Sequence, residues 1–467
     1  VAITFSSLAI VCASGGCSSN SGVMGLGDDA SSGSMSTFGV NPPPDSDAAP
    51  AQVPCTTGLC TQVRTDCSTT LSGTVYDPAG VNPLYNAVVF VPNDPAAKLP
   101  PISPGTHSCN RCDAPVANYV SVATTNSRGQ FTLKNVPAGS HIPIVVQMGK
   151  WRRTQFLSSV TACTNNTVPA SMSRLPRNQG EGDMPQMALL TGGCDDLGCF
   201  MKSIGIDASE FSPPGGGGRL DIYTGGDAAN QGGPSAPSLS GGRPGSAGNC
   251  AGSSCPLWSS KSNLEKYDIV ILACECSTNE ANKANKQPLH DWLAEGGKAF
   301  MTHFQYTWLK DGPSDFQKVA NWDPLPSTTP ENGPYQVDQS FSKGAALHDW
   351  LGSGVALNAN GTVPLNNPDV KTSVTTVNPP TLRWVYDSST NDAKYFSFLT
   401  PIGGPTYCGK AVFTDIHTSG GPQGNVPGDC GAPMLTPQQK ALEFLFFDLS
   451  ACVQQDDTVP PASPPPQ

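Results

Sequence analysis

The feature that most constrains the fold is a continuous apolar stretch, Ile269–Ala273. An apolar run without polar alternation is typical of a strand that is buried on both faces. A helix is expected to begin at Pro288 and to end at Gly296-Gly297. A second apolar strand then runs from Lys298 to Thr302. Strand, helix and strand at this spacing predict a βαβ unit, and therefore a parallel sheet.

The rest of residues 185–452 continues this alternation of helices and strands. Helices are expected at 195–204, 345–351 and 436–449, and strands at 219–224, 383–386, 394–399 and 409–415. Thr436 is expected to cap the last helix, with Pro437 in its first turn. We therefore predict that residues 185–452 form one α/β domain.

The pattern YDIVILACECS, followed by a helix and EGGKAFMTHFQY, resembles class I glutamine amidotransferase-like domains, especially the ThuA-like branch. The resemblance implies a flavodoxin-like three-layer sandwich with a mostly parallel sheet and a site at the carboxyl ends of the strands. Amidotransferases carry a Cys on a strand-to-helix elbow, where this chain has His303. Amidotransferase chemistry is therefore not expected, and the domain resembles a degenerate member.

Residues 67–165 favour a separate β domain, because short strand-like runs are bounded by Gly, Pro, Asn and Asp. SGTVYDPAG and TTNSRGQFTLKNVPAG resemble the carboxypeptidase regulatory-like domain, a transthyretin-like β-sandwich. The matching residues are Gly73, Asp77, Gly80, Thr125, Gly129, Phe131, Leu133, Val136, Pro137 and Gly139. The resemblance implies an accessory or binding module. The multidomain arrangement as a whole resembles uncharacterised secreted lipoproteins of myxobacterial type, which brings no established activity.

The first residues indicate export. Apolar Leu8–Cys12 is followed by small residues and then by Cys17, an order that resembles a bacterial lipoprotein cleavage box, although Ser14 stands where such boxes prefer Leu. We interpret residues 1–17 as a truncated signal with lipidation at Cys17. An ordinary secretory signal cut near Ala13 is the alternative. Residues 18–66 are expected to form a disordered stalk, and residues 453–467 a disordered Pro-rich tail.

Composition excludes some classes of protein. The chain has 26 basic and 37 acidic residues, a net charge of −11, which argues against a nucleic-acid partner. No stretch of 18 apolar residues occurs, so no membrane-spanning helix is expected. Seventeen cysteines favour disulfides in an oxidising compartment. If Cys17 is lipidated and Cys12 removed, an odd number remains, so at least one thiol is free or pairs between chains.

Several cysteines are close together in sequence. Cys109 with Cys112, Cys194 with Cys199, and Cys250 with Cys255 are interpreted as local disulfide staples. Cys274 and Cys276 would place both side chains on one face of a strand, and a disulfide between them would strain the backbone. Each is expected to pair elsewhere or to be buried. A thiol nucleophile activated by a nearby His is the alternative.

Polar residues stand at three predicted strand ends: Glu275, His303, and Asp415 with His417. Parallel strands place their carboxyl ends at one edge, so these side chains could bind a divalent metal or act as general acid and base. The alternative is that they cap strands and hydrogen-bond to loops. Gly215–Gly218 is interpreted as a hinge, and Trp151 to Arg153 as a packed Trp beside a solvated strand end.

Together these features predict an exported, lipid-anchored protein of the cell envelope with a non-catalytic binding or structural role. Its partner is expected to be a glycan, an envelope component or a protein, in addition to the membrane at Cys17. No cofactor is expected. The alternative function is a hydrolase that uses Glu275, His303, Asp415 and His417, with or without a metal.

Overall fold

The computed structural model describes residues 55–105, 109, 116, 118–225, 245–246, 257–327, 331–354, 356–418, 426–428, 430–431 and 434–456. Cys17, the signal segment, most of the predicted stalk and residues 457–467 lie outside this range. The described part is β-rich and contains four sheets. Residues 52–467 group into one compact unit.

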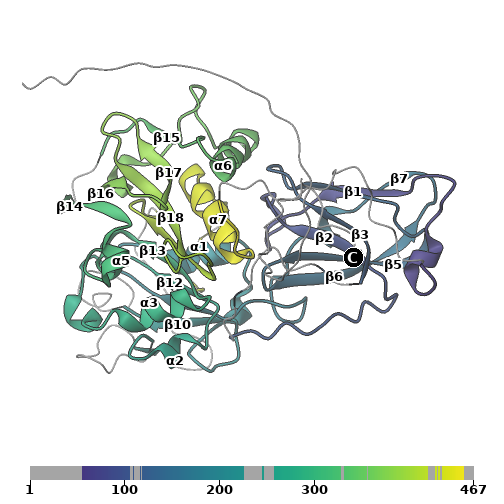
Figure 1. The fold of residues 1–467 in the computed structure, drawn as a ribbon, viewed down its shortest axis with the longest axis horizontal. Helices are drawn as coiled ribbons and strands as arrows, with labels where there is room; N and C mark the ends of the chain where they lie inside the picture. Colours follow the sequence, from purple (N-terminus) through teal and green to yellow (C-terminus); the bar gives the residue numbers. More distant parts are fainter. Residues whose placement is uncertain are drawn as a thin grey trace, which may run out of the picture. The chain divides into compact units, whose positions relative to one another are not determined.

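Two of the sheets are β-sandwich-like and lie between residues 70 and 167 (Figure 1). One has the order β4-β1-β7 and the other the order β3-β2-β5-β6. The strands are β1 (Thr70–Thr74), β2 (Val88–Pro92), β3 (Tyr119–Thr124), β4 (Gln130–Lys134), β5 (Gly139–Met148), β6 (Trp151–Val160) and β7 (Asn165–Thr167). The predicted turn at Asn126 to Gly129 joins β3 to β4, and Gly129 has a φ of 69°, which suits glycine.

The third sheet has ten strands. Its path is β11-β10-β8-β12-β13-β19-β18-β17-β15, and β9 pairs with β10. The strands are β8 (Met187–Leu190), β9 (Phe211–Ser212), β10 (Leu220–Thr224), β11 (Gly245–Ser246), β12 (Ile269–Leu272), β13 (Lys298–Thr302), β15 (Tyr335–Val337), β17 (Leu382–Asp387), β18 (Ala393–Thr400) and β19 (Gly409–Thr414). Pairing is parallel from β11 to β19 and antiparallel from β19 to β15.

The parallel strands have an informative order. Five of them occur in the chain as β8, β10, β12, β13 and β19, and in space they lie as β10-β8-β12-β13-β19. Numbered by chain order, this arrangement is 2-1-3-4-5. The direction of winding therefore reverses between β8 and β12, and in open α/β sheets such a reversal is the point at which ligands bind.

Helices pack on both faces of the large sheet. In β12, Ile269 and Ile271 belong to one hydrophobic core, while Val270 and Leu272 belong to another, as alternating side chains in a strand should. The first core includes residues of α1 (Leu197–Ser203), α6 (Ser342–Ser353) and α7 (Pro437–Ser450). The second includes residues of α2 (Lys261–Leu264), α3 (Gln287–Ala294), α4 (Thr307–Lys310) and α5 (Ser314–Gln317). Strands β14 (Ala320–Ser327) and β16 (Thr372–Val377) form a separate pair.

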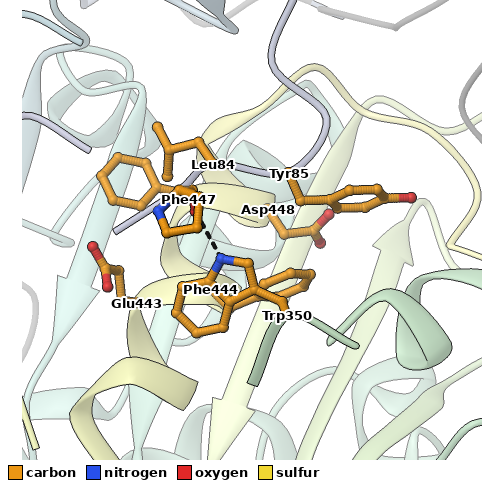
Figure 2. A pocket seen from close by; sticks show the side chains of 8 residues that line it. Leu84, Tyr85, Trp350, Glu443, Phe444, Phe447 and Asp448 are labelled. Carbon is orange, nitrogen blue, oxygen red and sulfur yellow. Dashed lines mark hydrogen bonds between the residues drawn. The ribbon is translucent and has the colours of Figure 1, made fainter. Parts of the chain in front are cut away.

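The sandwich strands and the α/β part share a core. Side chains from both sets of strands belong to the first core, together with α7. Tyr85 stacks on Phe444 of α7 with ring centroids 5.8 Å apart, and Trp151 meets Phe447 edge-on at 6.2 Å. Figure 2 shows the part of this contact that surrounds a small pocket, lined by Leu84, Tyr85, Trp350, Phe444 and Phe447 among others. Trp151 is therefore packed as expected.

The described chain extends beyond the boundaries expected from the sequence. Leu59 is buried and begins a 3-10 helix, Leu59–Gln62, within the segment expected to be stalk. Val453 and Asp456 are also buried, although the α/β domain was expected to end at residue 452. None of the helices in the described residues has the length and apolar character needed to span a bilayer.

Five disulfides join cysteines of the described part, which indicates an oxidising, extracellular environment. They are Cys55–Cys60, Cys67–Cys163, Cys109–Cys408, Cys194–Cys276 and Cys199–Cys430. The predicted local pairs Cys109–Cys112 and Cys194–Cys199 are wrong, because the fold brings distant segments closer than sequence neighbours. Cys250 and Cys255 lie outside the described residues. Cys276 pairs with Cys194, and Cys274 is buried and free. This confirms the expectation that each of these two cysteines pairs elsewhere or is buried.

Candidate functional site

The candidate site lies where the parallel strands end. The loops after β8, β12, β13 and β19 begin at Thr191, Ala273, His303 and Asp415. Parallel pairing places these four loops at one edge of the sheet. The edge includes the reversal between β8 and β12, which is where a ligand site is expected.

His303 begins a tight strand-to-helix turn. It follows β13 directly, starts the 3-10 helix His303–Tyr306 and has a φ of 37°. A positive φ costs a non-glycine residue about 1–3 kcal/mol and is found most often at functional sites. The turn places its imidazole 4.9 Å from the ring of His417, measured between centroids, and 4.2 Å from that of Phe304.

Cys274 lies beside His303. Its Sγ is 3.5 Å from His303 Nδ1, and it is the free cysteine of the described residues. Burial, together with the charge of Asp195, raises the pKa of the Cys274 thiol. Burial, and then His417, hold the pKa of His303 well below its usual value. The apo pair is therefore a thiol and a neutral imidazole, which is a poor state for a thiolate nucleophile.

Cys274, His303 and His417 form one buried cluster, which we call the Cys-His-His cluster. One ligand atom from each lies within 4.8 Å of the other two. The exposed fractions of the residues are 0%, 1% and 7%. Nε2 of both histidines is buried and has no hydrogen-bond partner. Two unpaired ring nitrogens and a thiol are a donor set for Zn²⁺ or copper.

Asp195 was not found from the sequence, yet it holds this edge together. Its carboxylate accepts hydrogen bonds from Thr302 Oγ1 at 2.5 Å and from the Thr418 backbone N–H at 2.8 Å. It therefore links the loops after β8, β13 and β19. Cys194–Cys276 links the loops after β8 and β12. An Asp at the start of a predicted helix usually indicates a helix cap. The position of Asp195 in the sequence therefore does not indicate that it bonds to Thr302 and Thr418.

Glu275 and Asp415 are at the same edge but are not members of the cluster. Glu275 is buried against Lys283, with its Oε2 2.5 Å from Nζ, and accepts from Gln305 Nε2 at 3.2 Å. Asp415 accepts from both the backbone N–H and the hydroxyl of Ser373 at 2.7 Å. Burial raises the pKa of Asp415 to about 6. Of the four predicted residues, the fold brings His303 and His417 together and gives each carboxylate a structural partner.

The other sequence candidates have structural partners. Arg152 pairs with Asp183 at 2.8 Å, and Arg153 donates to the Ser171 carbonyl. Gly218 packs so closely on Glu210 that a Cβ would lie 2.2 Å from its carbonyl oxygen. Gly218 thus meets β10 in a close turn, whereas a Cβ at Gly215 or Gly217 would face open space.

Comparisons with known proteins add little. No family model matches the chain, and no curated protein matches it. Among solved structures, the chain is similar to a type II cohesin–X-dockerin complex from Acetivibrio cellulolyticus, an N-terminal interface mutant. The match has 15% identity and a TM-score of 0.16, and it covers 32% of this chain and 88% of that chain. A TM-score this low carries no argument, so the candidate function depends on the site.

Proposed function

We propose that this chain is an exported, lipid-anchored envelope protein whose flavodoxin-like α/β part binds a transition-metal ion without catalysis. The ligands are Cys274, His303 and His417. The observation that carries the proposal is that one ligand atom from each of three buried metal-ligating side chains lies within 4.8 Å of the other two. The 2-1-3-4-5 strand order supports the flavodoxin-like assignment.

Burial limits the size of the ligand. A glycan or a peptide cannot reach side chains that are at most 7% exposed, whereas a single ion can be enclosed by them. Two ligands of one tetrahedral zinc lie about 3.6 Å apart when one is sulfur and one nitrogen. The Cys274 Sγ to His303 Nδ1 separation of 3.5 Å fits that spacing, so Nδ1 is the proposed ligand atom of His303. The envelope component or glycan expected from the sequence would then bind elsewhere, and the β-sandwich is the proposed place.

Charge also favours a divalent cation. Metal binding displaces the thiol proton and leaves a thiolate. The nearby Asp195 carboxylate adds a second negative charge, and its charge acts on Cys274. A divalent ion neutralises the two together. Burial favours the neutral form of the His303 imidazole, which is the form that binds metals.

The proposal predicts that one Co²⁺ binds per chain, with a sulfur-to-metal charge-transfer band. The experiment uses the disulfide-intact chain, stripped of metal with a chelator, and titrates Co²⁺ as the spectroscopic probe. Cys274→Ala should remove the charge-transfer band, and His303→Ala and His417→Ala should each weaken binding by about a hundredfold or more. Circular dichroism of the metal-free variants checks that they fold.

His348→Ala is the matched control, because His348 lies on α6, outside the cluster, and its loss should leave Co²⁺ affinity unchanged. Equal Co²⁺ spectra for the parent chain and a folded Cys274→Ala variant would refute the proposal. The proposal would also be refuted if the number of Co²⁺ ions bound per chain fell only in His348→Ala, because the metal would then be bound outside the cluster.

A metal-assisted hydrolase is the second candidate function. It is favoured by the number of ligands, because catalytic zinc sites use three protein ligands and leave a fourth position for water. Hydrolysis of p-nitrophenyl acetate by the zinc-loaded chain, abolished in Cys274→Ala, would support this alternative. Binding of zinc without turnover supports the non-catalytic role.

A further inference from the structure

A second group of buried acids lies outside the Cys-His-His cluster, between the sandwich strands and α7. Asp77 belongs to the loop of residues 77–82, which follows β1, and Glu443 belongs to α7. Both residues are 0% exposed. The loop is closed by the Asp77 N–H to Asn82 carbonyl hydrogen bond, and Ala79 N–H donates to the Ile204 carbonyl after α1. It therefore docks on the α/β part.

The hydrogen bonds of Asp77 and Glu443 leave one oxygen of each acid without a partner. Asp77 Oδ1 accepts from the Val81 N–H at 2.8 Å, and Glu443 Oε2 accepts from Asn82 Nδ2 at 2.8 Å. The remaining oxygens, Asp77 Oδ2 and Glu443 Oε1, are buried without another partner. The two side chains are within hydrogen-bonding reach of each other. Two carboxylates cannot bond to each other, but a carboxylic acid and a carboxylate can.

The surroundings offer little compensation for a second negative charge. Figure 2 shows Glu443 beside a small pocket lined by Leu84, Tyr85, Trp350, Phe444 and Phe447, with its carboxylate pointing away from Tyr85 and Trp350. Lys440 on α7 acts on Glu443 but donates its Nζ to the Gly354 carbonyl.

The other charged or titratable groups nearby have partners of their own. Asp448 on α7 is bound by Lys343 and Lys410, and Arg177 donates Nε to the Pro78 carbonyl. Burial raises the pKa of the Tyr85 phenol to about 12, so it is neutral. Burial, and for Glu443 the neighbouring Asp77, also raise the pKa of both acids above the ordinary range.

We propose that Asp77 and Glu443 share one proton, and that this proton makes the contact between the 77–82 loop and α7 sensitive to pH. The shared proton gives Asp77 Oδ2 and Glu443 Oε1 the partner that each otherwise lacks. When the proton is lost, two carboxylates face each other in an apolar site and repel. The contact then weakens, and the loop separates from α7.

The sign of the pH dependence follows from the raised pKa values. In the unfolded chain both acids are ionised above their ordinary pKa values, while the folded chain retains one proton. The stabilisation that the shared proton contributes is therefore complete below about pH 4.5 and decreases as the pH rises. It is lost once the pH passes the folded-state pKa of the pair. One retained proton corresponds to about a tenfold fall in the folding equilibrium constant per pH unit within that interval.

The test compares urea unfolding of the full chain with that of Asp77→Asn and Glu443→Gln between pH 5 and pH 9. Each variant keeps the shape and supplies an N–H donor, so the slope of stability against pH should be smaller than that of the parent chain by about one proton. Asp338→Asn is the control, because Asp338 pairs with Arg383 at 2.9 Å and shares no proton. Protection of the amides of residues 76–85, measured relative to their base-catalysed intrinsic exchange, should fall at high pH in the parent chain and not in Glu443→Gln.

A slope that persists unchanged in a folded Asp77→Asn variant would overturn the proposal. If neither variant folds, infrared spectroscopy of the parent chain decides. A protonated carboxyl band at neutral pH supports the shared proton, and a spectrum with ionised carboxylates alone contradicts it.

Discussion

Replacing Asp456 with Ala is expected to destabilise the fold by about 3–5 kcal/mol. Asp456 accepts from Lys343 Nζ at 2.8 Å, from Lys410 Nζ at 2.7 Å and from Ser397 Oγ at 2.9 Å, and all four side chains are buried. Removing the carboxylate leaves two buried ammonium groups with Asp448 as their remaining acidic partner. Urea denaturation followed by circular dichroism measures the loss.

The same carboxylate predicts sensitivity to acid. Burial opposes its charge, but Lys343 and Lys410 outweigh burial and hold the pKa of Asp456 below its ordinary value. Its contribution is thus present above about pH 3.8 and is lost as the pH falls toward the folded-state value. Asp66→Ala is the control, since the Arg64–Asp66 pair is exposed and should change nothing measurable. A loss below about 1 kcal/mol in Asp456→Ala would mean that the ion pairs of Asp456 with Lys343 and Lys410 do not stabilise the fold as expected.

Phe444→Ala is expected to lower the free energy of unfolding by about 3–5 kcal/mol. The Phe444 ring lies among those of Tyr85, Trp350 and Trp384, with centroids 5.8, 5.5 and 6.2 Å away. Tyr85 and Trp350 are drawn with Phe444 in Figure 2. Truncation leaves a cavity where the sandwich strands meet α7. The measurement is again urea unfolding, with near-ultraviolet circular dichroism to report the loosened aromatic packing.

Phe156→Ala provides the comparison, because Phe156 is partly exposed and stacks on His141 at 4.3 Å. Its loss should be nearer to about 1 kcal/mol. Equal decreases in the free energy of unfolding for the two variants would show that the contact between the sandwich strands and α7 does not stabilise the fold as a buried core would.

The parts of the fold that depend on local pattern could be predicted from sequence. The apolar run at β12 and the capped helix at Thr436 are present, the latter with a full capping box to Gln439. The helix expected from Pro288 is also present and begins one residue earlier, at Gln287. Strand β8 was missed, since four apolar residues give too short a signal to distinguish a strand from a helix segment. Yet β8 is central, because the sheet reverses beside it.

The candidate site could be predicted only in part, for a geometric reason. His303 and His417 were placed correctly at one edge because parallel strands end together. Cys274 and Glu275 are neighbours in extended chain, so when one faces the cluster the other faces away, and Glu275 meets Lys283 instead. Disulfide partners and Asp195 depend on contacts between distant segments, which no local pattern reveals.

X-ray absorption of the zinc-loaded chain tests the central claim most directly. The Cys-His-His cluster predicts one sulfur ligand at about 2.3 Å and two nitrogen ligands at about 2.0–2.1 Å. The sulfur shell should vanish in Cys274→Ala and persist in His348→Ala. A zinc spectrum with oxygen and nitrogen ligands and no sulfur in the parent chain would contradict the assignment of this edge of the sheet as a metal site.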